Sequence, residues 1–224
     1  MTDDTPPSWS ILIPTIGQRE ALFLRLLDVL LPQLDEFAGS VRVIGWRNDG
    51  QPSLGEIRDG LVDAAGRAGS EYVSFVDDDD LVPEYYVAEV MAALATRPDH
   101  IGFLLEYSKN GVVAELVEHS LRWRKWGRSA AGVLYRDLTH VDPIRTTIAQ
   151  RGRFAAARAK RAEDRVWVRQ VRPHLATEVY LDKIMYRYLW SPETSAWQAP
   201  ERIVRGGPRP AIDHPHFSWH ERSD

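Results

Sequence analysis

The residues best suited to chemistry are four consecutive aspartates, Asp77–Asp80, which follow the apolar run Glu71–Val76. The run is short and rich in aromatic and β-branched residues, so it predicts a buried strand. Two carboxylates about 5 Å apart repel by roughly 0.8 kcal/mol even in water, and a cation between them turns that repulsion into attraction. Ligands of open α/β sheets bind outside the carboxyl ends of the strands, where we expect these aspartates. The cluster predicts a site for a divalent metal and phosphate, with a solvated acidic turn as the alternative.

The composition excludes several other kinds of site. The 224 residues include no cysteine, so disulfides, thiolate zinc sites and a cysteine nucleophile are excluded. A calcium loop is excluded too, because Leu81 and Val82 stand where that motif needs an aspartate and a glycine. The acidic start does not resemble a secretory signal, and the longest apolar region, Ala21–Leu34, is interrupted by charges and a proline. We therefore expect a cytoplasmic protein of one α/β domain without a transmembrane segment.

Positive charge is concentrated in the second half, although the net charge is −4. The segment 145–172 has nine basic and two acidic residues, and the segment 122–128 has four basic and no acidic ones. Such asymmetry is typical of a face that meets an anionic partner, nucleic acid included. A solvated, arginine-rich helix is the equally simple alternative.

The elements that must position the aspartates alternate along the first half. Apolar runs predict three strands, and helical spacing, a capping box at Ser53 and Glu56, and a proline at Pro83 predict the helices between and after them. Alternation of this kind indicates a parallel sheet with right-handed crossovers. The expected strands are Trp9–Ile13, Val41–Trp46 and Glu71–Val76; the expected helices run from Gln18 to Pro32, from Ser53 to Ala68 and from Pro83 to Thr96.

The second half is less regular. Lys109-Asn110-Gly111 between two apolar runs predicts a β-hairpin of Ile101–Tyr107 and Val112–Glu118. Further on we expect a short strand at Gly132–Tyr135, a helix at Glu163–Gln170 and a strand within Thr177–Trp190. Residues 1–98 and 99–190 are predicted to form the two halves of one domain. The proline-rich residues 191–224 are predicted to form a tail that closes over the site as a lid.

Three loops fall at the carboxyl ends of the three predicted parallel strands. They are Pro14-Thr15, Asn48-Asp49-Gly50 and the aspartates, and in a doubly wound sheet they converge on one edge. A nucleotide bound there would hydrogen-bond its base to Asp49 and reach a metal at the aspartate cluster. Arg58, in the second helix, would point at the base or the pyrophosphate, unless it is a surface residue.

These segments together resemble the family 2 glycosyltransferases of the GT-A fold. The resemblance is carried by IPTIGQR, VIGWRNDG, GEIRDGL, EYVSFVDDDDLVPEYY and AEDRVW, and it spans about Trp9–Tyr188. It implies a Rossmann-like, mostly parallel α/β sheet with a small mixed β region. It also implies a nucleotide-sugar donor, with UDP the expected nucleotide, and Mn²⁺ or Mg²⁺ as cofactor.

The resemblance assigns roles to individual residues. Asp79 would bind the metal, Asp78 the ribose of the donor, and Asp77 would complete the D-x-D pattern as a second metal or donor contact. The residues implied around the nucleotide are Pro14, Thr15, Asp49 and Arg58. One departure is Asn48, where the family usually has an aspartate.

Glu163-Asp164 resembles the Glu-Asp pair that supplies the general base in this family. A base must accept the proton of the acceptor hydroxyl as that oxygen attacks, which a carboxylate can do. We assign the base to Asp164 and an orienting role to Glu163, in an inverting displacement. The alternative is simply an acidic first turn of a helix.

The acceptor is the least defined part. Trp123 and Trp126 are interleaved with basic residues, which suits a sugar ring or, with the basic segments, a phosphate backbone and a stacked base. Acceptors consistent with this are a saccharide, a lipid, a protein, or a hydroxymethylated base in phage DNA. His140 and Arg161 are further acceptor candidates, and His214 and His216 are candidates to complete the metal site. The rival functions are a nucleotidyltransferase and a non-catalytic sugar-nucleotide-binding module.

Overall fold

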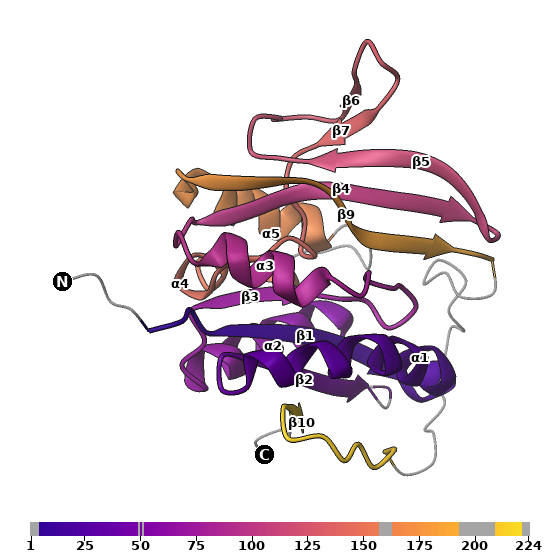
Figure 1. The fold of residues 1–224 in the computed structure, drawn as a ribbon, viewed down its shortest axis with the longest axis vertical. Coiled ribbons are helices and arrows are strands. Elements are labelled where there is room, and N and C mark those ends of the chain that lie inside the picture. The colour runs from indigo at the N-terminus through magenta and orange to yellow at the C-terminus, as the bar shows by residue number, and fades with distance from the viewer. Residues whose placement is uncertain (1–4, 49, 51, 157–162, 193–208, 221–224) are drawn as a thin grey trace.

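The computed structural model describes residues 5–48, 50, 52–156, 163–192 and 209–220. Within these residues ten strands form one sheet in the order β10–β2–β1–β3–β8–β4–β5–β7–β6, with β9 beside β4 (Figure 1). β1 (Trp9–Ile16) lies between β2 (Val41–Asn48) and β3 (Tyr72–Phe75) and runs parallel to both. This part of the sheet has the arrangement predicted from the alternating strands and helices.

β1 extends further than the sequence predicts. Its ladder with β2 continues through Pro14 and Thr15 as far as the pair Ile16 and Asn48, so the prediction of a loop at Pro14-Thr15 is wrong. Pairing with β3 stops earlier, at Leu12. Proline has no N–H to donate, and it is tolerated in a strand where one side has no ladder partner.

Helices connect the first three strands and follow the third. They are α1 (Glu20–Leu30), α2 (Leu54–Arg67) and α3 (Tyr86–Leu94). The predicted capping box opens α2, since Ser53 Oγ accepts from the N–H of Glu56 and the Glu56 carboxylate accepts from the N–H of Ser53. A proline-bearing 3₁₀ turn, η2 (Leu31–Phe37), follows α1. α3 begins three residues after Pro83, whose carbonyl instead accepts the Tyr86 N–H in the turn before it.

Successive side chains of β1 point to opposite faces of the sheet, so the strand contributes to a separate part of the core on each face. Ile11 and Ile13 pack with the apolar residues of α1 and α3, whereas Leu12 packs on the opposite face with α2, α4 (Thr146–Ala149) and α5 (Glu163–Val171). Figure 1 shows α3 in front of the sheet and α5 behind it. Because both faces are covered, β3 is buried throughout and β1 is buried as far as Thr15, as expected for parallel strands.

The second half widens the sheet with mixed strands. β4 (His100–Lys109) and β5 (Val112–His119) form the predicted hairpin, whose turn has positive φ at Asn110 and Gly111. β9 (Glu178–Trp190) runs parallel to β4. The remaining strands are short: β6 (Gly127–Arg128), β7 (Leu134–Arg136) and β8 (Ile144–Arg145), which joins the two halves by pairing with both β3 and β4.

The described part of the tail adds an edge strand, β10 (Phe217–Trp219), parallel to β2. Both aromatic rings of β10 pack against Phe23 of α1, with centroids 6.1 and 5.3 Å away. Residues 209–220, which belong to the predicted tail, thus use the apolar side chains of β10 to cover the β2 edge. Residues 193–208, on which a lid would also depend, lie outside the described residues.

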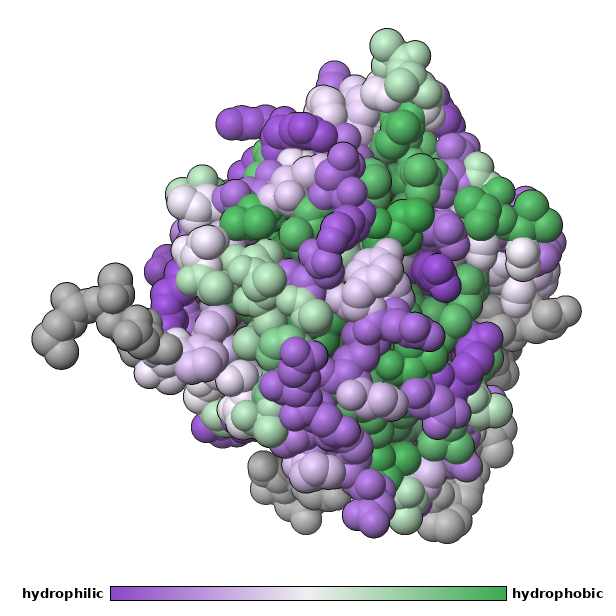
Figure 2. All heavy atoms as spheres, viewed as in Figure 1, coloured by the Kyte–Doolittle hydropathy of each residue, from purple (hydrophilic) through white to green (hydrophobic). Residues whose placement is uncertain are grey.

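Apolar and polar side chains are mixed over most of the face seen in Figure 2, with apolar ones gathered toward the β4, β5 and β7 end. Val112 and Val113, at the start of β5 next to the hairpin turn, are exposed. No helix among the described residues is both long and apolar enough to cross a membrane.

Candidate active site

The carboxyl ends of β1, β2 and β3 meet at one edge, as the sequence predicts. Asn48 ends β2 and fixes the loop beyond it: its Oδ1 accepts from the Gly50 N–H at 2.9 Å and its Nδ2 donates to the Pro52 carbonyl at 3.1 Å. An amide can do both, whereas an aspartate has no hydrogen to donate. Asn48 thus has a structural reason to stand where the resembling family has an aspartate. Asp49 itself lies outside the described residues.

Arg58, buried in α2, connects the acidic loop with α5. Its Nη2 donates to Asp77 Oδ1 at 2.9 Å and its Nη1 donates to Glu163 Oε1 at 2.8 Å. The guanidinium also lies over the rings of Phe75 and Phe154, 5.7 and 5.8 Å from their centroids. Because both terminal nitrogens are used in this way, Arg58 is placed to hold the two acidic groups together rather than to point at a nucleotide base.

Asp77 is held as a carboxylate by two neighbours. Its Oδ1 accepts from Arg58, and its Oδ2 lies 3.2 Å from His140 Nε2. Burial acts to raise the pKa of Asp77, but the charges and hydrogen bonds of Arg58 and His140 outweigh it and hold that pKa well below its usual range. His140, a predicted acceptor residue, therefore lies against Asp77.

Asp78 and Asp79 share one cation, Arg19 of the 3₁₀ turn η1 (Gly17–Arg19). Arg19 Nη1 lies 2.9 Å from Asp78 Oδ1 and 3.3 Å from Asp79 Oδ2. Burial raises the pKa of Asp78, and Arg19 and a hydrogen bond from the Thr15 side chain oppose that effect. Burial also raises the pKa of Asp79, to about 7, an effect that Arg19 opposes and Asp77 and Asp78 reinforce. The pKa of Asp79 thus lies near neutral pH, and an added cation would favour the ionised form of this carboxyl group.

Asp80 serves the fold. Its Oδ2 accepts from the Tyr186 hydroxyl at 2.8 Å and its Oδ1 accepts from the Leu189 N–H at 2.8 Å. The same tyrosine oxygen accepts from the Asp77 N–H at 3.0 Å. Burial and the nearby carboxylates raise the pKa of Asp80 well above its ordinary value. These contacts anchor the acidic loop to β9.

Asp164, the candidate base, lies at the start of α5 next to Glu163. Its Oδ2 is 3.9 Å from Arg136 Nη2. The guanidinium carbon of Arg136 also lies 4.0 Å from the centroid of the Trp126 ring. Trp126 is 53% exposed. Burial lowers the pKa of Arg136 against the opposing effect of Asp164. Trp126 thus presents an exposed aromatic ring that is linked through Arg136 to the candidate base.

Trp123 differs from Trp126 in being packed. Its ring stacks on Tyr135 with the centroids 3.8 Å apart, and its Nε1 donates to Glu118 Oε1 at 2.6 Å. Of the two tryptophans predicted to bind the acceptor, Trp126 is therefore the one with an available ring.

Several arginines in the described parts of the basic segments form ion pairs within the protein. Arg122 pairs with Glu118, and Arg128 pairs with Glu115 at 3.0 Å, both across to β5. In the second segment several arginines also pair with carboxylates elsewhere in the chain: Arg145 with Glu71 and Asp99, Arg153 with Asp63, and Arg172 with Asp137. At these arginines the positive charge is balanced within the protein.

The tail histidines lie away from the aspartates. His214 is 3.6 Å from Asp35 of η2, and His216 precedes β10. Because β10 is three strand intervals from β3, this strand is about 14 Å from the one that leads to Asp79. The prediction that His214 and His216 complete a metal site on Asp79 does not fit this geometry.

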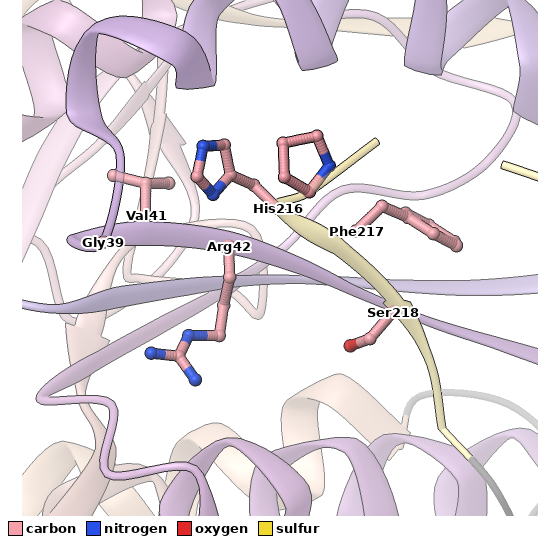
Figure 3. Close-up of a pocket in the computed structure, with 7 residues that line it drawn as sticks. Gly39, Val41, Arg42, His216, Phe217 and Ser218 are labelled. Atoms are coloured by element: carbon pink, nitrogen blue, oxygen red, sulfur yellow. The ribbon is translucent and has the colours of Figure 1, made fainter. Parts of the chain in front are cut away.

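A pocket of about 270 Å³ lies beside these histidines, between the amino end of β2 and the tail. Figure 3 shows Arg42 and His216 of its lining pointing to opposite sides of the strands. Its polar side chains do not converge, and it is at the opposite end of β2 from Asn48. We therefore place the candidate active site at the aspartates and not in this pocket.

Some residues of the site were not predicted from the sequence. Arg19 had a signal, because it lies just after the first strand, but its partners did not. Tyr186 and Arg136 had none, since they meet Asp80 and Asp164 only through the fold. The predicted acceptor residue Arg161 lies outside the described residues.

The carboxylates suit a divalent metal that is shared with a phosphate ligand. Among the described residues there is no group of three or more histidine, aspartate or glutamate side chains that could hold an ion. Mg²⁺ and similar ions commonly take one or two carboxylates and complete their shell with water and substrate phosphates. Asp79 fits this role, with a side chain 13% exposed. Asp77 fits it less well, because Arg58 and His140 engage both of its oxygens.

The fold of this chain is similar to the folds of solved structures. The chain is similar to S. aureus TarS 1-349 in complex with UDP-GlcNAc, at 16% identity and a TM-score of 0.57, covering 82% of this chain and 59% of that one. The UDP complex of the same TarS fragment matches at 18% identity and a TM-score of 0.57, covering 83% of this chain and 61% of that one. This chain thus spans about three fifths of the TarS fragment. No family model matches it, and no curated protein sequence does.

At this level of identity the similarity establishes the fold. The chain is a mixed α/β protein whose central, mostly parallel sheet matches that of TarS, a protein solved with UDP-GlcNAc and with UDP. The fold class predicted from the sequence is confirmed.

Proposed function

We propose that this chain is a metal-dependent, inverting glycosyltransferase that uses a UDP-sugar as donor. The observation that carries the proposal is the bridge of Arg58 between Asp77 and Glu163, 2.9 and 2.8 Å long. It brings the acidic loop and the Glu-Asp pair, two segments that are far apart in the sequence, to one edge of the parallel sheet. The fold of TarS, solved with UDP and UDP-GlcNAc, supports a uridine nucleotide as the donor to test first.

The donor side follows from the arrangement of the carboxyl ends of β1, β2 and β3. Asp49 would meet the base, and Asp78, on a loop that Arg19 and Thr15 fix, would meet the ribose. Arg58 and His140 would keep Asp77 ionised and in place. Pro14 and Thr15, at the end of β1, would form the floor beneath the nucleotide.

Asp79 would hold the divalent ion together with oxygens of the donor diphosphate. When bound, such an ion acts as a Lewis acid and neutralises the charge that develops on a leaving diphosphate. Mn²⁺ and Mg²⁺ both suit carboxylate and phosphate oxygens.

Asp164 would act as the base in a single displacement. The acceptor oxygen forms a bond to the anomeric carbon while the bond from that carbon to the diphosphate oxygen breaks, and its electron pair leaves with UDP. The acceptor proton passes to Asp164. Glu163, held by Arg58, orients the start of α5, and Arg136 Nη2 lies 3.9 Å from Asp164 Oδ2.

The acceptor would stack on Trp126. An exposed ring beside the candidate base suits a saccharide, and the pairing of Arg122 and Arg128 with glutamates disfavours a nucleic-acid backbone on the same segment. Salt separates these acceptors: binding through several phosphates weakens steeply as salt increases, whereas saccharide binding does not.

The test is to incubate the protein with Mn²⁺ and a panel of nucleotide sugars and to measure the nucleoside diphosphate released. We expect slow hydrolysis of a UDP-sugar, which Asp79→Ala abolishes and which Asp28→Ala, at an exposed position of α1, leaves unchanged. Pyrophosphate release from nucleoside triphosphates, with no diphosphate released from any sugar nucleotide, would instead identify a nucleotidyltransferase.

The base is tested separately with Asp164→Asn, once a turnover assay is in hand. We expect transfer to an acceptor to be lost while UDP binding, measured by calorimetry, is kept. Transfer at the rate of the unsubstituted protein would remove Asp164 from the mechanism.

A further inference from the structure

We propose that Arg19 is a built-in counter-ion of Asp78 and Asp79, which a divalent cation has to displace when it binds. The inference rests on the proposed function for its setting, because the cation concerned is the one that would accompany a nucleoside diphosphate. It adds a specific role for a residue outside the predicted site: Arg19 makes the nucleotide-free protein a weak metal binder.

The contacts of Arg19 are those expected of a bridging cation. A single nitrogen, Nη1, lies 2.9 Å from Asp78 Oδ1 and 3.3 Å from Asp79 Oδ2. The Arg19 side chain is 17% exposed, so the interaction is only weakly screened by water. Burial acts to lower the pKa of Arg19, but Asp78 and Asp79 outweigh it and raise that pKa, so the guanidinium stays charged.

The other cations near the aspartates are less able to play this part. Arg58 is buried between Asp77 and Glu163. If Arg58 moved away, both carboxylates would lose this ion-pair partner. Arg25 reaches only a main-chain group here, since its Nη2 donates to the Asp79 carbonyl at 3.4 Å. Among the described residues, the guanidinium that meets the Asp79 carboxylate is that of Arg19, on a short 3₁₀ turn at the edge of the sheet.

Charge balance then predicts the behaviour of the site. With Arg19 in place, the ionised pair Asp78 and Asp79 carries a net charge of −1, and without it −2. A divalent cation on Asp79 is repelled by a guanidinium a few ångströms away, so it binds weakly until that group leaves. A diphosphate provides an alternative partner for Arg19 and extra oxygens for the metal, so metal and nucleotide bind together.

The experiment titrates Mn²⁺ alone, without nucleotide, into the full chain and its variants by calorimetry. Arg19→Gln removes the charge, and we expect it to tighten Mn²⁺ binding by about tenfold or more. Arg19→Lys keeps the charge with a single donor group and should lie between the two. Arg42→Gln, which removes the same charge at the amino end of β2, should change the affinity by less than about twofold because of distance and salt screening.

Asp79→Asn in the Arg19→Gln background identifies the site, because the added affinity should disappear. Mn²⁺ binding by Arg19→Gln that is equal to or weaker than that of the unsubstituted chain would overturn the inference, provided that circular dichroism shows the variant folded. If Arg19→Gln does not fold, unchanged binding by Arg19→Lys has the same consequence.

The two proposals fail separately. If UDP-sugar hydrolysis is observed and Arg19→Gln has unchanged Mn²⁺ affinity, the counter-ion role is wrong and the glycosyltransferase stands. If no sugar nucleotide is hydrolysed and Arg19→Gln binds Mn²⁺ more tightly, the counter-ion role stands and the proposed function is wrong.

Discussion

Two groups of buried ionisable side chains lie in this chain, one in each half, and their surroundings differ. In the second half Asp142 is fully buried, with Oδ1 2.8 Å from His119 Nδ1 and Oδ2 3.6 Å from His100 Nε2. The other nitrogen of His100 lies 3.1 Å from Glu178 on β9, and the Thr139 N–H donates to Asp142 at 2.6 Å. Protein groups surround this cluster, which joins β4, β5 and β9.

The acidic loop in the first half is arranged differently. Asp80 is closed off by Tyr186 and Leu189, like Asp142, but Asp79 keeps a partly exposed carboxylate whose pKa burial raises to about 7. Burial acts to raise the pKa of Asp142, but His119 and His100 outweigh this effect and hold that pKa well below its usual range.

The contrast separates structure from function. Asp142, which has two histidines and a backbone N–H around its carboxylate, is stabilised as an anion and holds strands together. A carboxylate with one shared cation and an open side is in an environment that a ligand can improve.

Asp142→Ala is expected to destabilise the protein most. It leaves His100 and His119 buried without their shared partner, which costs about 3–5 kcal/mol. Urea unfolding at pH 7 measures it. Because the folded-state pKa of Asp142 is lowered, its ionised form adds stability above the unfolded value near pH 4, and that contribution is lost as the pH falls further. The difference between variant and parent should therefore shrink in acid, and a difference that does not change with pH would contradict the assignment.

Arg58→Met should cost less stability and more activity. Asp77 and Glu163 are partly exposed, so water can replace some of the lost hydrogen bonds, and we expect a loss of about 2 kcal/mol. Since α5 loses its tie to the acidic loop, turnover should fall by about 100-fold. Asp63→Asn, which breaks a surface pair on the same helix, is the matched control. Full activity in Arg58→Met would show that the bridge does not position the site.

Asp79→Asn should have the opposite effect on stability to Asp142→Ala. The unfolded chain releases this proton near pH 4 and the folded chain near pH 7, so the parent loses stability as the pH rises between those values. The variant avoids this loss and should be more stable by on the order of 1–2 kcal/mol at pH 8, and equal to the parent below pH 4. Thermal unfolding at both pH values measures it. A variant that is less stable at pH 8 would show that Asp79 is structural.

Trp126→Ala should change stability least, by about 0.5 kcal/mol or less, because the ring is largely exposed. If the ring binds the acceptor, the KM for the acceptor rises while hydrolysis of the donor alone is unchanged. Arg128→Ala, in the same segment but paired with Glu115, is the control. An unchanged acceptor KM would place the acceptor elsewhere.

Local signals predicted much of the fold. The capping box at Ser53, the turn at Asn110-Gly111 and the apolar strands each depend on residues within a few positions of one another. The three-residue strand β10 could not be predicted this way, since it follows a proline-rich stretch and is fixed by contacts with Phe23, almost two hundred residues earlier.

In the site, too, contiguous residues could be predicted and contacts between distant residues could not. The aspartates and the Glu-Asp pair were visible because they are contiguous. The different environments of Asp79 and Asp80 were not, because they depend on Arg19 and on Tyr186, 106 residues beyond Asp80. The excess of basic residues was visible as a count, but the glutamates that pair with Arg122 and Arg128 belong to another strand.

We propose that the open acidic loop, and not the closed Asp142 cluster, binds a nucleoside diphosphate. The direct measurement is a calorimetric titration of UDP in the presence of Mn²⁺ into the parent chain, Asp79→Ala and Asp28→Ala. We predict that the parent and Asp28→Ala bind equally and that Asp79→Ala binds at least about tenfold more weakly, a difference of about 1.4 kcal/mol or more. Equal binding of UDP by all three, with each shown to be folded, would contradict the claim.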